Sequence, residues 1–103
     1  MTWPFAEPAT TEVITLGRIL RGESPLLLIT HDEEDGEWQF LDGEQVFEDD
    51  AVVICLGEMV QFDPSVSEVA DLPTGSYAWR SNLNEPWMQA RGDSPILPSR
   101  DAI

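Results

Sequence analysis

The sequence predicts a small α+β fold, with a mainly antiparallel sheet of about four strands and two or three short helices. A chain of 103 residues, 42% of them apolar, is long enough for one domain with its own core. Apolar runs between turn signals predict strands at residues 26–30, 38–41, 51–56 and 76–80. Apolar residues at helical spacing precede the first run and follow the third. The resulting order of helix, hairpin, strand, helix and strand favours an α+β architecture.

The beginning of the chain predicts an arm followed by a helix. Segment 1–9 contains two prolines and is expected as an extended arm that Trp3 and Phe5 hold to the surface. A threonine cap then precedes apolar residues at helical spacing, and Gly22 is a suitable helix stop. The residues that carry this spacing are Val13, Leu16, Ile19 and Leu20.

A β-hairpin follows. Asp35-Gly36 lies between the apolar runs 26–30 and 38–41, and glycine accepts the positive φ that a tight turn requires. Side chains alternate between the two faces of a strand, so Trp38 and Phe40 are expected on one face.

The second half of the chain predicts a brief strand at 45–47 and a helix with a recognisable start. Asp63 can cap this helix and Pro64 can occupy its first position. Residues 10–88 are therefore expected to form a single domain, and residues 89–103 a flexible tail.

The charge of the chain is concentrated in its middle. The sequence has 20 acidic and 5 basic residues, a net charge of −15, and no lysine. Residues 22–79 contain fifteen acids and no arginine, and ten of these acids lie within residues 32–50. Nucleic acids and anionic membranes are recognised through Lys and Arg, so neither is an expected partner. A basic protein is the partner that this charge favours.

The sequence predicts a cytoplasmic protein, with a monomer as the default state. The first residues have neither a basic region nor an apolar stretch of the kind found in signal peptides. The single cysteine, Cys55, lies within an apolar run and is expected to be buried and unreactive.

No residue pattern predicts a catalytic centre, a metal site or a cofactor. The acidic segment around Gly36 fails the calcium-loop pattern, because His31 and Asp42 occupy the first and twelfth positions, which require Asp and Glu. His31, the only histidine, is expected in a turn and bonded to a neighbouring carboxylate. A small carboxylate- or metal-dependent hydrolase remains an alternative, because paired carboxylates can act as acid and base.

The leading hypothesis is a non-enzymatic protein-binding domain that engages a basic partner through two acidic loops. A third alternative assigns the acidity to solubility and places an apolar dimer or partner interface at Trp3, Phe5, Trp87 and Met88. The candidate partner-binding residues are Asp32, Glu33, Glu34, Asp35, Glu37, Glu48, Asp49 and Asp50.

Several short motifs, in this order, resemble a group of small bacterial domains of unknown function, some of which are labelled immunity-protein-like. The motifs are His31-Asp32, Asp35-Gly36, Trp38-Gln39-Phe40-Leu41, Asp63-Pro64-Ser65, Asp71-Leu72-Pro73, Ala78-Trp79-Arg80 and Pro86-Trp87. The resemblance implies a stand-alone bacterial domain without known catalytic residues. An immunity-type inhibitor of a basic toxin is one function it implies.

Overall fold

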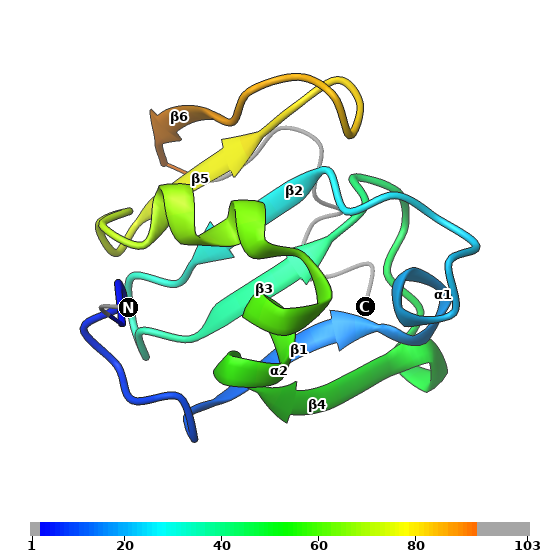
Figure 1. Cartoon of the computed structure of the whole chain (residues 1–103), viewed down its shortest axis with the longest axis horizontal. Helices are drawn as coiled ribbons and strands as arrows, with labels where there is room; N and C mark the ends of the chain where they lie inside the picture. The colour runs from blue at the N-terminus through cyan, green and yellow to red at the C-terminus, as the bar shows by residue number, and fades with distance from the viewer. Residues whose placement is uncertain (1–2, 93–103) are drawn as a thin grey trace.

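The computed structural model describes residues 3–92, which form a six-stranded sheet, two α-helices and two 3-10 helices (Figure 1). The strands lie in the order β4-β1-β3-β2-β5-β6. Their bounds are β1 Glu12–Leu16, β2 Leu28–His31, β3 Trp38–Leu41, β4 Ala51–Cys55, β5 Ser76–Trp79 and β6 Met88–Arg91. The helices are α1 Gly17–Leu20, α2 Leu56–Phe62, and the 3-10 helices η1 Glu48–Asp50 and η2 Pro64–Val69.

The predicted α+β class is confirmed, but the sheet is larger than expected and mixed. β1 pairs in parallel with β3, and the other four neighbouring pairs are antiparallel. The expected number of about four strands is too small, because the sequence analysis omits β1 and β6.

The helix expected over residues 13–20 is wrong for the first half of that segment, which forms β1. Val13, Ile14 and Thr15 are all β-branched, and such a run favours a strand over a helix. The Thr15 side chain is fully buried and its hydroxyl donates a hydrogen bond of 2.8 Å to the carbonyl of Phe40. Only one helical turn, α1, remains of the expected helix.

β6 extends the sheet beyond the expected end of the domain at residue 88. Its sequence, Met-Gln-Ala-Arg, lacks β-branched residues, so the pairing with β5 and not local propensity holds it as a strand. The part of the expected tail from residue 93 onward lies outside the described residues. The brief strand expected at 45–47 is absent from the described fold, where these residues form the loop that leads to η1.

The predicted hairpin and the predicted helix cap are both confirmed. β2 and β3 pair from Leu28 with Leu41 to His31 with Trp38, and Gly36 has a φ of +71° in the turn between them. Asp63 accepts a hydrogen bond of 3.0 Å from the backbone N–H of Ser65 at the start of η2.

One face of the sheet carries the hydrophobic core. Figure 1 shows α2 and η2 on this face, and the alternation of β3 directs Trp38 and Phe40 toward it, as predicted. The buried side chains from the helices that complete this core are Leu56, Met59, Val66 and Val69. Within residues 3–92, no helix has the length and apolar character needed to cross a membrane.

The N-terminal arm belongs to the core and is more than a surface attachment. Phe5 is 5% exposed and its ring meets Trp38 edge-on, with 5.3 Å between the ring centres. The Glu7 carboxylate accepts a hydrogen bond of 2.9 Å from the indole N–H of Trp38. The arm therefore covers one end of β3, whereas Trp3 remains partly exposed.

Two chain connections meet at the opposite end of the sheet. Segment 17–27 runs from β1 to β2 and must pass the end of β3, which lies between those strands. Segment 42–50, which we call the acidic loop, runs from β3 to β4 and must pass the end of β1. Both connections lie on the α1 side of the molecule in Figure 1.

We expect Phe5→Ala to lower the free energy of unfolding by about 3 kcal/mol, because it removes a buried aromatic ring and leaves a cavity against Trp38. Trp3→Ala is the matched control and should cost less than about 1 kcal/mol, since Trp3 is 37% exposed. Urea denaturation monitored by circular dichroism measures both. Equal losses in the two variants would contradict the assignment of the arm to the core.

Candidate functional site

Arg18 joins the two connections that meet at one end of the sheet. Its guanidinium donates to both carboxylate oxygens of Asp42, at 2.7 and 3.0 Å. It also donates a hydrogen bond of 2.8 Å to the carbonyl of Gln45 and one of 3.3 Å to the carboxylate of Asp50. This one side chain therefore fixes the beginning, middle and end of the acidic loop.

Asp42 is the most deeply placed carboxylate of this network, with its side chain 1% exposed. Burial alone would raise its pKa, but hydrogen bonds from Arg18, Ser24 and the backbone of Glu44 outweigh burial and lower the pKa to about 2. The Ser24 hydroxyl donates a hydrogen bond of 2.6 Å to the Asp42 carboxylate. Asp42 is thus ionised at neutral pH and serves the structure of the loop.

Asp50 closes the same network at the other end of the acidic loop. Its carboxylate lies 3.3 Å from Arg18 and 3.6 Å from Arg21, which itself pairs with Glu23 at 3.0 Å. Gly17 permits this approach, because a Cβ at that position would lie 2.9 Å from the Asp50 carboxylate. Asp50, predicted as a partner-binding residue, is therefore occupied by two arginines inside the molecule.

Glu48 and Asp49, the other predicted residues of this loop, are exposed. They follow Phe47, whose side chain is 52% exposed, and they precede Val53, which is 60% exposed at the edge of the sheet. The loop thus presents an aromatic ring and carboxylates together. The acids are evident from the sequence, whereas the exposed ring of Phe47 is not, because residues 45–47 are expected to form a strand.

The other predicted acids, Asp32, Glu33, Glu34, Asp35 and Glu37, form the hairpin tip at residues 32–37. The tip joins the end of β2 to the start of β3, whereas the acidic loop follows the end of β3, so the two lie at opposite ends of the sheet. The two acidic segments therefore do not lie side by side. Two of the tip carboxylates also shape the turn: Asp32 accepts from the N–H of Glu34 at 2.7 Å, and Asp35 from that of Glu37 at 2.9 Å.

His31 has a structural position at the end of β2 and does not lie in a turn. Its Nδ1 donates a hydrogen bond of 2.7 Å to the carbonyl of Leu72. Its ring stacks on Trp38, with 3.9 Å between the ring centres. The nearby carboxylate is Glu7 of the arm, 3.5 Å from Nε2, and not a sequence neighbour.

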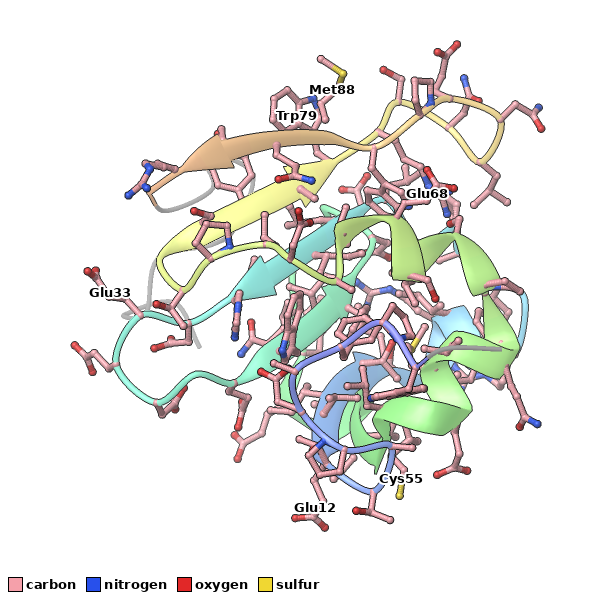
Figure 2. The ribbon with its side chains drawn as sticks, turned by 60° about the vertical axis from the view of Figure 1, so that its left-hand side comes forward. Glu12, Glu33, Cys55, Glu68, Trp79 and Met88 are labelled. Atoms are coloured by element: carbon pink, nitrogen blue, oxygen red, sulfur yellow. The ribbon has the colours of Figure 1, made fainter. Side chains whose placement is uncertain are left out.

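Cys55 is half-buried at the end of β4 (Figure 2), whereas the sequence predicts a buried thiol there. Its backbone N–H donates a hydrogen bond of 3.0 Å to the carboxylate of Glu58, which caps α2. Partial burial and the neighbouring carboxylates, Glu58 first, raise the pKa of the thiol. A raised pKa disfavours the thiolate and hence nucleophilic chemistry at Cys55.

The residues of the expected apolar interface do not form a common surface. Phe5 is buried in the core, and Trp87 lies against the guanidinium of Arg80, 4.1 Å from its ring centre. Only Trp3 and Met88 are exposed. Among the described residues, no group of three or more His, Cys, Asp or Glu side chains is placed to hold a metal ion.

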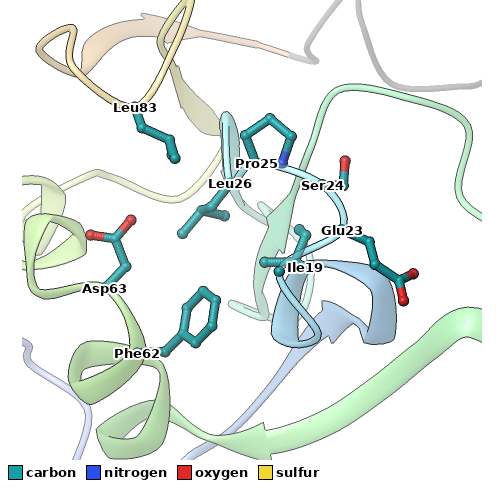
Figure 3. Close-up of a pocket in the computed structure, with 9 residues that line it drawn as sticks. Ile19, Glu23, Ser24, Pro25, Leu26, Phe62, Asp63 and Leu83 are labelled. Atoms are coloured by element: carbon teal, nitrogen blue, oxygen red, sulfur yellow. The ribbon is translucent and has the colours of Figure 1, made fainter.

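An open pocket of about 400 Å³ lies beside the Arg18 network (Figure 3). It is bounded by the end of α1, the turn that follows it, the end of α2 and the loop after β5. Phe62 and Leu83 are 44% and 56% exposed on its walls. Its lining residues are Ile19, Gly22, Glu23, Ser24, Pro25, Leu26, Phe62, Asp63 and Leu83.

Comparisons with protein-family models, curated proteins and solved structures gave no match to this chain. The resemblance to immunity-protein-like domains stays a prediction.

The Asp42 carboxyl should make stability depend on pH. Its pKa is about 2 in the folded protein and 3.8 when unperturbed, so its contribution is present above pH 4 and disappears as the pH falls through 2. We expect the wild type to lose about 2 kcal/mol more than Asp42→Asn between about pH 5 and pH 2. Urea denaturation across this range measures the difference, and parallel pH profiles would contradict it.

Proposed function

We propose that this chain is a non-enzymatic domain that binds a basic protein through the acidic loop, residues 42–50. Binding to a basic toxin, as an immunity-type inhibitor, is one case of this function. The observation that carries the proposal is the exposed ring of Phe47 next to the exposed carboxylates of Glu48 and Asp49. Protein interfaces commonly combine an aromatic anchor with a charged rim.

The attachment of the loop supports this assignment. Arg18 contacts Asp42, Gln45 and Asp50, so the residues between them are held in one arrangement before a partner arrives. A preordered loop loses less conformational entropy on binding and therefore binds more tightly.

Electrostatics supports a basic partner over a neutral one. Arg18 and Arg21 are paired with Asp42, Asp50 and Glu23, so these two arginines are already engaged beside the exposed acids. A net charge of −15 accelerates encounter with a positively charged protein, and this acceleration weakens with salt.

The experiment compares two charge reversals of equal size. Glu48→Lys with Asp49→Lys changes the acidic loop, and Glu33→Lys with Asp35→Lys changes the hairpin tip at the opposite end of the sheet. Each tagged variant is used to capture partners from a lysate of the organism that encodes the chain, at low and moderate salt. We expect the first double variant to lose the basic protein that the wild type captures, by about tenfold or more.

The hairpin-tip variant should retain that protein, because it carries the same change in net charge at a distant place. A loss confined to the hairpin-tip variant would assign binding to residues 32–37 and overturn our assignment. Equal losses would indicate attraction by net charge alone, and no basic protein captured by the wild type would contradict the proposed function.

A further inference from the structure

The pocket beside the Arg18 network has the chemistry of a site for an organic cation. We infer that it receives an arginine side chain of the basic partner, an inference that rests on the proposed function and names the group recognised. The pocket and the acidic loop both lie at the end of the sheet where segments 17–27 and 42–50 meet. One partner surface can therefore reach both.

The walls of the pocket suit the aliphatic part of an arginine. Ile19 and Leu26 contribute apolar side chains from segment 17–27, and Leu83 contributes one from the loop after β5 (Figure 3). Leu83 is more than half exposed, so covering it with the methylene groups of a ligand removes apolar surface from water.

Phe62 and Asp63 suit the guanidinium group. The ring of Phe62 is 44% exposed, and a flat guanidinium can stack on such a ring. The Asp63 carboxylate accepts one hydrogen bond from Ser65 and one from Arg80, at 3.0 and 2.8 Å. A carboxylate has about four acceptor positions, so Asp63 can accept further donors from a ligand.

The charged residues around the pocket favour a cation over an anion. Two carboxylates, Glu23 and Asp63, belong to the lining, whereas Arg21 and Arg80 do not. Arg80 is 6% exposed and is directed toward Asp63, Ser65 and the carbonyl of Leu26. Figure 3 shows the Glu23 side chain directed away from the other lining residues, so Asp63 is the carboxylate available to a ligand, in a protein of net charge −15.

The test uses arginine itself as the probe, without the protein partner. N-acetyl-arginine methylamide is titrated into the ¹⁵N-labelled full chain and followed by NMR. The matched probes are the citrulline analogue, which has the same shape without the charge, and the lysine analogue. We expect saturable shifts at the amides of Leu26, Phe62 and Leu83, with a dissociation constant in the millimolar range. The citrulline and lysine analogues should bind at least about fivefold more weakly.

Three variants refine the test. Leu83→Lys places a competing ammonium at the exposed wall and should abolish the saturable shifts, whereas Leu83→Met keeps the apolar contact and should preserve them. Phe62→Leu removes the ring but keeps an apolar side chain, and should weaken binding about fivefold. Far-ultraviolet circular dichroism verifies that each variant remains folded.

Several results would overturn this inference. Equal binding of citrulline would identify a purely apolar pocket, and equal binding of lysine would identify a site for any cation. Arginine-induced shifts confined to the amides of Glu48 and Asp49 would show that arginine binds at the acidic loop and not in the pocket. The absence of saturable shifts would show that the pocket does not bind arginine. If Glu48→Lys with Asp49→Lys loses the captured partner while Leu83→Lys retains it, the pocket inference fails and the proposed function stands. If arginine binds in the pocket but no basic protein is captured, the pocket is a site for the guanidinium group, and both the proposed function and the assignment of that group to a basic partner fail.

Discussion

The end of the sheet that carries the acidic loop depends on the contacts of one side chain, Arg18. The strand order places two connections there: segment 17–27 passes the end of β3, and segment 42–50 passes the end of β1. The second connection contains Asp42 and Asp50, whose negative charges would repel each other without a cation nearby. Arg18 pairs with both carboxylates and with a loop carbonyl, so it joins the two connections and neutralises part of their charge. The buried position of Asp42 is tolerable because this pair is well hydrogen-bonded.

The same arrangement explains how a chain with 20 acids can fold with only five arginines. Arg18, Arg21 and Arg80 each contact a carboxylate on another segment of the fold. Because residues 22–79 contain no arginine or lysine, the sequence alone predicts a middle segment without counter-charge. The structure corrects this: Arg18 and Arg21 lie just before that middle segment, and Arg80 just after it, and all three reach into it. The acids left free for a partner under the proposed function are therefore exposed ones outside these ion pairs, such as Glu48 and Asp49.

Local sequence signals predict the local parts of this fold and fail where pairing is distant. Asp35-Gly36 determines the hairpin turn, and Asp63-Pro64 determines the start of η2, because the atoms involved lie within a few residues. β6 depends on pairing with β5, which begins twelve residues earlier, and contains no β-branched residue of its own. The pairing of Arg18 with Asp42 spans 24 residues, so no spacing rule indicates it. The β-branched run at β1 favours a strand, but the apolar residues of this segment also recur at helical spacing, and that spacing leads to the wrong prediction of a helix.

The acidic loop and the pocket are mechanically linked through Arg21. This arginine contacts Glu23, which lines the pocket, and Asp50, which closes the loop. Asp42 extends the link, since it holds both Arg18 and Ser24, and Ser24 also lines the pocket. These ion pairs and hydrogen bonds therefore connect the acidic loop to Glu23 and Ser24 on the pocket wall. The same charged residues hold the loop and the pocket wall. Under the proposed function, a partner that engages the loop would therefore meet the pocket wall already ordered, and preordering of this kind favours tight and selective binding.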